Sequence, residues 1–312
     1  MNVNRQGACH LCPRECGADR SKGERGYCGA GEEPIVARAA LHMWEEPCIS
    51  GSRGSGAVFF SGCQLRCVSC QNHDIALMRG GTKISTRRLA DIFLELEEQG
   101  AHNINLVTPT HFIHSIKEAL VLAKSEGLGI PIVFNTGGYD KAGTLRELDG
   151  LVDIYLPDMK YHGREAAKRY SNAPDYFEVA ARALQEMVRQ TEGLLFEDDG
   201  SEDGLMKRGV IVRHLLLPGG LEDSKAVVRY LYETYGDRIY MSLLNQYTPM
   251  PQVRDRFPEL ERTVSEEEYD ELVDYAIELG VTNCFIQEGE AISESFIPQF
   301  DGYGVLPVDK ED

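Results

Sequence analysis

Basic residues are scarce in this sequence. Its 312 residues include 32 Lys and Arg against 50 Asp and Glu, and the formal net charge at pH 7 is −18. Phosphate backbones and anionic lipid surfaces repel a chain with so much negative charge. We therefore expect neither nucleic acid nor a membrane surface as a partner.

Long hydrophobic runs are also missing. A membrane-spanning helix needs roughly 18 or more consecutive apolar residues, and no such run occurs. The first seven residues lack the charged start and apolar stretch of a secretion signal. These two absences predict a cytoplasmic protein. Because 42% of the residues are hydrophobic, the chain can bury a large core as one large domain or two small ones.

The sequence contains nine cysteines, and in a reducing compartment cysteines form few disulfides and more often bind metal. Seven of them fall into two clusters, which are Cys9, Cys12, Cys16 and Cys28, followed by Cys63, Cys67 and Cys70. Cys48 and Cys284 stand alone, and a lone cysteine usually packs as a small buried hydrophobe. The two clusters are therefore the candidate metal sites.

From residue 57 onward, apolar strand-like runs alternate with segments that have helical periodicity. The strands are expected at residues 57–61, 103–107, 131–135, 152–156, 210–217 and 239–244. Such alternation predicts a parallel α/β sheet with right-handed crossovers, which six units would curve into a partial, TIM-like (β/α)6 barrel. Residues 281–286 are a candidate seventh strand, and Ser265 to Glu268 has the pattern of a capping box that opens a C-terminal helix.

These patterns divide the chain into two parts. Residues 1–50 show little periodicity and are interpreted as an N-terminal metal-binding segment with four cysteines and a linker. Residues 51–312 are interpreted as the partial barrel with a C-terminal extension.

Cys63, Cys67 and Cys70 directly follow the first expected strand, so they should lie at its C-terminal end, where α/β barrels carry their active sites. Three thiolates within eight residues can hold one face of a [4Fe-4S] cluster and leave the fourth iron open to a small molecule. A zinc site or three structural cysteines are the alternatives, although closed zinc sites usually have four ligands.

The C-x3-C-x2-C spacing after the first strand of a β/α chain resembles the radical S-adenosylmethionine (SAM) superfamily. The resemblance implies that the amino and carboxylate groups of SAM bind the open iron. An electron then cleaves SAM to methionine and a 5′-deoxyadenosyl radical, which abstracts hydrogen from a substrate. Ser69 stands where the superfamily usually has an aromatic residue before the third cysteine.

The same resemblance assigns roles to polar residues at the later strand ends. Thr108 and Thr110 occupy the place of the Gly-Gly-Glu segment that contacts the SAM amino group, and their hydroxyls can accept from an ammonium group. Asn135 lies in a segment similar to the Thr-Asn-Gly of glycyl-radical activating enzymes, and Asn245 or Gln246 would have to serve where those enzymes often have a histidine near the adenosine.

Three charged residues are the candidates for catalysis as well as for SAM binding. Asp158 and Lys160 resemble the Asp-x-Lys of the activating enzymes, in which both residues face the active site. Arg213 lies on a strand like the arginine-bearing strand of those enzymes, and its planar fork can pair with the SAM carboxylate. The alternative for each is a strand-end hydrogen bond or ion pair that only stabilises the barrel.

Nearly the whole chain resembles the pyruvate formate-lyase activating enzyme-like proteins. Residues 42–51, 107–111 and 245–249 carry this likeness beyond the cysteine motif. It implies a radical SAM oxidoreductase that takes hydrogen from the backbone glycine of a glycyl-radical enzyme and receives electrons from a flavodoxin- or ferredoxin-type protein. Modification of a small molecule or peptide, and a non-catalytic Fe-S or zinc interaction module, are the alternatives.

Cys9, Cys12, Cys16 and Cys28 can close four thiolates around a second metal site. Their spacing fits a structural zinc and a second iron–sulfur cluster about equally. Reduced thiols without a metal are the third alternative.

Overall fold

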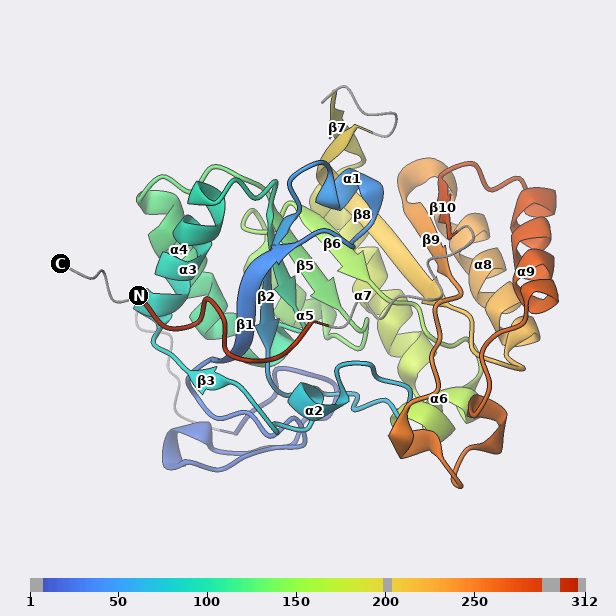
Figure 1. Cartoon of the computed structure of the whole chain (residues 1–312), viewed down its shortest axis with the longest axis horizontal. Coiled ribbons are helices and arrows are strands. Elements are labelled where there is room, and N and C mark those ends of the chain that lie inside the picture. Colours follow the sequence, from blue (N-terminus) through green and yellow to red (C-terminus); the bar gives the residue numbers. More distant parts are fainter. Residues whose placement is uncertain (1–7, 199–203, 288–297, 308–312) are drawn as a thin grey trace.

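The protein is described here by a computed structural model that covers residues 8–198, 204–287 and 298–307. Its central sheet has the strand order β10-β9-β8-β6-β5-β4-β2-β1-β3, with β7 paired to β8 (Figure 1). The strands are β1 Ile35–His42, β2 Ser55–Phe60, β3 Thr82–Lys83, β4 Ile104–Val107, β5 Ile132–Thr136, β6 Ile154–Pro157, β7 Leu195–Glu197, β8 Leu205–Leu215, β9 Tyr240–Leu244 and β10 Cys284–Ile286.

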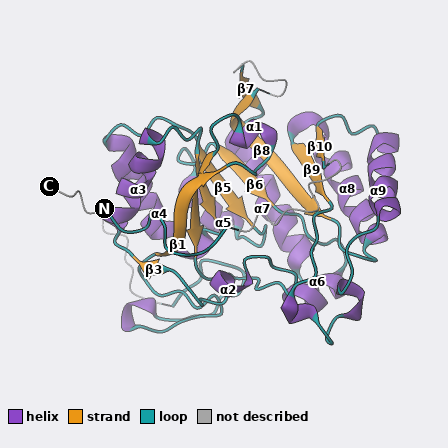
Figure 2. Cartoon of the chain, in the orientation of Figure 1, coloured by secondary structure: helices purple, strands orange, loops and turns teal. Residues whose placement is uncertain are grey.

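Helices flank this sheet on its outer side (Figure 2). The α-helices are α1 Pro47–Ser50, α2 His73–Ala76, α3 Thr86–Glu98, α4 Ile113–Ser125, α5 Ala142–Leu145, α6 Arg164–Ser171, α7 Tyr176–Thr191, α8 Leu221–Tyr235 and α9 Glu266–Leu279. Within the described ranges, every helix is too short or too polar to cross a membrane.

The strands β2, β4, β5, β6, β8, β9 and β10 pair in parallel with their neighbours. This confirms the predicted α/β architecture, including the seventh strand near residue 284. The sheet path begins at β10 and ends at β3 rather than closing on itself, so the barrel is partial.

The periodic apolar residues explain why the helices form where they do. In α3, Leu89, Ile92, Phe93 and Leu96 are all buried, and burial of each such side chain contributes about 1.5–3 kcal/mol. The capping box predicted at residue 265 is also present, because the Ser265 side chain accepts from the Glu268 backbone and the Glu268 side chain from the Ser265 backbone. Local sequence signals therefore determine these elements.

The N-terminal segment reaches further into the barrel fold than its sequence indicated. Residues 35–42, which the sequence interpretation placed in the metal-binding segment and linker, form β1 and pair antiparallel with β2. The C-terminal residues 302–303 in turn bond to β1, since Gly302 N donates to Ala37 O and Ala39 N donates to Tyr303 O. Both ends of the chain thus extend the barrel at its β2 edge.

The short helix α1 fills the interior of the partial barrel. Its residues Cys48 and Ile49 pack with buried side chains of β5, β6 and β8, which are Val133, Ile154, Leu156, Met206 and Ile211. Figure 1 shows α1 lying across β6 and β8. The burial of Cys48 confirms the prediction of a small buried hydrophobe, and the segment that enters α1 passes through the centre of the fold.

Candidate functional site

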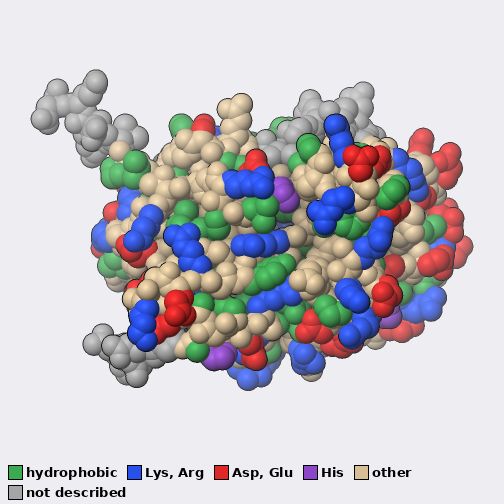
Figure 3. Space-filling model, turned by 90° about the horizontal axis from the view of Figure 1, so that it is seen from below, with side chains coloured by type: hydrophobic (Ala, Val, Ile, Leu, Met, Phe, Trp, Pro, Cys, Tyr) green, Lys and Arg blue, Asp and Glu red, His purple; other side chains and the backbone are tan. Residues whose placement is uncertain are grey.

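A cavity of about 300 Å³ lies at the C-terminal ends of the parallel strands. Its walls include the three cysteines of the loop after β2 together with five of the predicted strand-end residues, namely Thr108, Asn135, Asp158, Lys160 and Arg213. Figure 3 views this end of the molecule, where basic side chains are spread over the middle of the face and acidic side chains gather toward α8 and α9. The tertiary structure thus brings most of the predicted site residues to one cavity.

The cysteine loop presents three thiols to this cavity, with Cys67 buried and Cys63 and Cys70 partly buried. Burial raises the pKa of Cys63 to about 11 and that of Cys70 to about 12, and the neighbouring thiols add to both rises. Three thiolates in so small a volume need a compensating positive charge, which a metal centre provides. The donor set therefore fits an iron–sulfur cluster.

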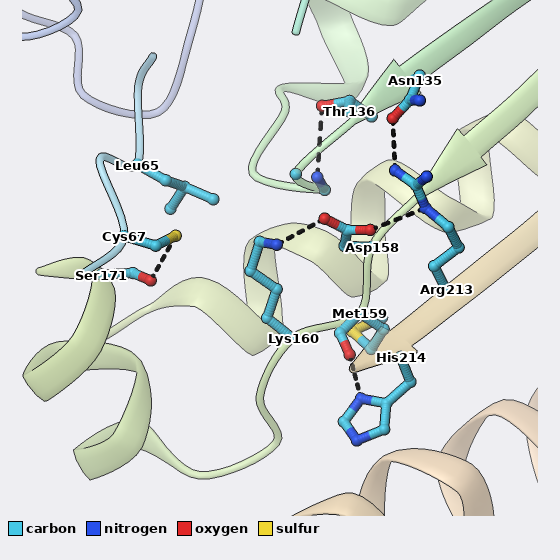
Figure 4. Close-up of polar contacts among 12 residues, drawn as sticks. Leu65, Cys67, Asn135, Thr136, Asp158, Met159, Lys160, Ser171, Arg213 and His214 are labelled. Carbon is cyan, nitrogen blue, oxygen red and sulfur yellow. Dashed lines mark hydrogen bonds and ion pairs between the residues drawn. The ribbon is translucent and has the colours of Figure 1, made fainter. Parts of the chain in front are cut away.

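Two of these sulfur atoms accept hydrogen bonds. The Ser171 hydroxyl donates to Cys67 Sγ at 2.9 Å (Figure 4), and the backbone N–H of Leu65 donates to Cys63 Sγ at 3.3 Å. Donors of this kind suit thiolate ligands, and hydrogen bonds to sulfur tune the potential of a cluster.

No group of three or more His, Cys, Asp or Glu side chains in the described part of the chain is placed to hold a single metal ion. Each cysteine that binds a cubane cluster ligates a different iron, so its sulfur atoms do not have to converge on one point. A cluster held by Cys63, Cys67 and Cys70 is consistent with this arrangement.

Beside the cysteines, charged side chains form a row across the cavity (Figure 4). Lys160 Nζ donates to Asp158 Oδ2 at 2.5 Å, and Arg213 Nε donates to Asp158 Oδ1 at 3.2 Å. Arg213 Nη2 also donates to Asn135 Oδ1 at 2.5 Å, so Asn135 is the next residue in the row. The row therefore joins the ends of β5, β6 and β8.

The pKa shifts follow from burial and from these contacts. Burial alone would raise the pKa of Asp158, but the charges of Lys160 and Arg213 outweigh burial and hold it below its ordinary value. Burial would lower the pKa of Lys160, yet the Asp158 carboxylate and the Cys67 sulfur raise it well above its usual range. Asp158, Lys160 and Arg213 are consequently all charged at neutral pH.

The sequence interpretation gave no role to Glu45, which the structure brings into the same network. Its Oε2 accepts from Arg213 Nη1 at 3.2 Å, and its Oε1 accepts from Asn105 Nδ2 at 2.8 Å. Burial raises the pKa of Glu45, and the Arg213 charge opposes that rise. The sequence did contain a signal for a buried carboxyl group, because two adjacent acidic residues, Glu45 and Glu46, precede a segment of small and apolar residues.

Two predicted SAM contacts lie outside the cavity wall. Thr110 is fully buried, and its hydroxyl donates to Asp140 Oδ1 at 2.6 Å. Asn245 is also buried, whereas its neighbour Gln246 lines the cavity. Thr108 does line it, with φ of +57°, an unusual left-handed conformation for a β-branched residue. Side-chain direction, rather than position at a strand end, separates these three residues.

The N-terminal cysteines share one neighbourhood next to the cysteine loop. Burial raises the pKa of Cys12 to about 12, with further contributions from Cys28 and Cys9, while Cys16 is exposed. A methyl group on Gly62, the residue before Cys63, would lie 2.8 Å from the carbonyl oxygen of Cys28. The N-terminal cysteine segment therefore packs directly against the loop that carries the cavity cysteines.

Arg14 ties the same segment to the cavity loop. Its Nε donates to Gln64 O at 2.9 Å, and its Nη2 donates to Ser171 O at 3.0 Å. One arginine thus connects the N-terminal segment, the cysteine loop and the end of α6.

Comparison with known proteins agrees with this arrangement. Residues 57–192 match the family described as the Radical SAM superfamily. Over 278 residues the chain is 27% identical to the uncharacterized protein MJ0674 of Methanocaldococcus jannaschii, a match that covers 86% of this chain and 74% of the relative.

Solved structures share the fold. A radical SAM methyltransferase from Sphaerobacter thermophilus has a TM-score of 0.52 and 14% identity, with 76% of this chain and 67% of that chain covered. Native anSMEcpe with bound AdoMet has a TM-score of 0.48 and 13% identity over 70% of this chain and 57% of that chain, so this chain spans a little more than half of that protein.

Residues 57–192 thus match the superfamily that the cysteine spacing resembles, and the methyltransferase structure shares the fold. The pyruvate formate-lyase activating enzyme-like subgroup stays a prediction.

Proposed function

We propose that this chain is a radical SAM enzyme that cleaves S-adenosylmethionine reductively at a [4Fe-4S] cluster held by Cys63, Cys67 and Cys70. The observation that carries the proposal is that these three thiols and the charged groups of Asp158, Lys160 and Arg213 line one cavity. When bound, such a cluster supplies the electron that breaks SAM into methionine and a hydrogen-abstracting 5′-deoxyadenosyl radical.

The side chains of the cavity would position the ligand. Lys160 places a positive charge beside the three sulfur atoms, because it opposes the pKa rise of both Cys63 and Cys70. Arg213 offers its guanidinium to a carboxylate, and Asp158 offers its carboxylate to an amino or hydroxyl group. Thr108 and Asn135 add polar atoms to the same wall. These groups suit a ligand that carries both charges, as the amino-acid end of SAM does.

For the substrate, we propose hydrogen abstraction from the backbone glycine of a glycyl-radical enzyme, with electrons from a flavodoxin- or ferredoxin-type protein. The resemblance of residues 107–111 and 245–249 to the activating enzyme-like proteins supports this choice. Modification of a small molecule or peptide is the second candidate, and a non-catalytic interaction module is the third.

The reduced protein, reconstituted anaerobically with iron and sulfide, should convert SAM to 5′-deoxyadenosine. Liquid chromatography with mass detection measures this product. A peptide with α-deuterated glycine, added as substrate, should transfer deuterium into the 5′-deoxyadenosine. Cleavage without deuterium transfer would favour a different hydrogen donor, and iron binding without any cleavage would favour the non-catalytic module.

We further propose that Cys9, Cys12, Cys16 and Cys28 hold a second metal centre, either zinc or an iron–sulfur cluster. Elemental analysis of a Cys9→Ser/Cys12→Ser variant should show loss of one zinc or of about half the iron. The Cys284→Ser variant is the control, because Cys284 lies in β10 away from both clusters. Unchanged zinc and iron in the double variant would contradict a second site.

A further inference from the structure

Glu45 reaches the cavity from a part of the chain that lies outside the family match at residues 57–192. It stands between β1 and α1, and α1 packs against β5, β6 and β8 inside the barrel. The Glu45 side chain is 8% exposed and the Arg213 side chain 18% exposed, so their contact is largely withdrawn from water. The segment that fills the barrel therefore also delivers a carboxylate to the site.

This carboxylate completes a three-sided clamp on the Arg213 guanidinium. Glu45 accepts from Nη1, Asn135 accepts from Nη2 and Asp158 accepts from Nε. The acceptors come from three separate elements, and Asn105 on β4 holds the other oxygen of Glu45. Such a clamp fixes the plane of the guanidinium as well as its position.

A guanidinium has five N–H groups. The described partners use three of them in Arg213, which leaves one N–H on each terminal nitrogen. Two parallel N–H groups on the terminal nitrogens match the two oxygens of a carboxylate. These two remaining N–H groups are the donors that the clamp leaves for a ligand carboxylate.

Net charge alone does not explain carboxylate binding here. Among the described residues of this network, the carboxyl groups of Glu45, Glu46 and Asp158 outnumber the cations of Lys160 and Arg213 by three to two. An anion therefore meets more carboxyl groups than cations here, whereas SAM as a whole carries one positive charge. Binding of its carboxylate must then depend on how the donors are oriented.

We propose that Glu45 is a positioning residue that orients Arg213 to bind the carboxylate of S-adenosylmethionine, an inference that rests on the function proposed above. Glu45 acts through Arg213 and does not itself touch the ligand carboxylate. Its removal lets the guanidinium rotate between Asn135 and Asp158, and the two free N–H groups no longer face the cavity together.

The test is equilibrium binding to the reconstituted holoprotein, measured anaerobically by titration calorimetry with two probes. SAM carries the carboxylate, and decarboxylated SAM lacks it while keeping the amine, the sulfonium and the adenosine. In Glu45→Gln, the affinity for SAM should fall about tenfold, and the affinity for decarboxylated SAM should stay within about twofold, as expected for loss of one charge-assisted contact.

Glu46→Gln is the matched control. Glu46 is also buried, and the Arg213 charge also lowers its pKa against the effect of burial, but the ion pairs of that guanidinium are with Glu45 and Asp158. The ratio of the two affinities should be unchanged in this variant. Should Glu45→Gln not fold, Glu45→Asp keeps the charge, withdraws it by one methylene group and should show the same selective loss for SAM.

Equal weakening of both probes in Glu45→Gln would show that Glu45 only supports the fold, and unchanged binding of both would show that it has no part in recognition. Either result overturns the inference while wild-type binding of SAM still supports the proposed function. A wild-type holoprotein that binds neither probe contradicts the proposed function, and the inference fails with it.

Discussion

The Cys67→Ala variant should lose the cavity cluster and reduce SAM cleavage to the background rate. Cys67 is 7% exposed, lies between the other two cysteines of the loop and receives the Ser171 hydrogen bond. Without the Cys67 thiolate, a second iron of the cluster would lack a protein ligand, and the cluster would be held by two thiolates only. Iron content, the visible absorption of the reconstituted protein and 5′-deoxyadenosine formation measure the loss.

Cys284→Ala provides the control for Cys67→Ala. Cys284 is partly buried in β10, at the end of the sheet opposite to β2 and the cysteine loop. This variant should keep the cluster spectrum and the cleavage activity. If Cys67→Ala retained the spectrum of the wild-type protein, Cys67 would not be a ligand and the assignment of the cavity cluster would be wrong.

The Arg213→Met variant should lower the free energy of unfolding by about 3–5 kcal/mol. The substitution keeps much of the side-chain volume but leaves the Glu45 carboxyl group buried without its cation, while Asp158 keeps only Lys160. A buried charge without a partner is costly because the interior cannot replace its hydration. Chemical denaturation of the metal-free protein at neutral pH measures the difference.

Arg79→Met is the comparison for this cost. Arg79 pairs with Asp74 at 3.2 Å, but both side chains are more than half exposed, so loss of that pair should cost at most about 1 kcal/mol. A similar cost for the two variants would mean that the Arg213 network is solvated in solution. That result would also remove the rigid clamp on which the role of Glu45 depends.

The pH dependence of the free energy of unfolding should differ between the wild-type protein and Arg213→Met because of Asp158. Its pKa is lowered in the folded protein by Lys160 and Arg213, so its contribution to stability is present above the unfolded pKa of about 4. That contribution is lost as the pH falls through the lower folded pKa. In Arg213→Met the folded pKa moves upward, so this part of the acid sensitivity should shrink.

Local sequence patterns were sufficient for most of the fold. Apolar runs near residues 104, 132 and 154 became parallel strands because a buried strand needs only a short stretch of apolar side chains. The strand β1 was missed because residues 35–42 mix Arg38 and His42 with small residues and lack clear alternation. Its pairing with β2 depends on contacts that the segment makes only after the sheet has formed.

The candidate site was likewise predicted in part from the sequence. The spacing of Cys63, Cys67 and Cys70 requires no distant partner, because three ligands within eight residues lie close together in any compact loop. Thr110 and Asn245 were also placed correctly near strand ends, but both are buried and neither lines the cavity. Position in the sequence predicts where a strand ends and does not predict where each side chain beyond it points.

The sequence by itself determined the parallel α/β order, the cysteine loop at the end of the first parallel strand and the charged residues at two later strand ends. These follow from periodicity and short spacings, which act between near neighbours in the chain. Only the tertiary structure decided that Glu45, 168 residues from Arg213, would hold that guanidinium. A contact over that separation forms when α1 packs into the barrel, and no local pattern encodes it.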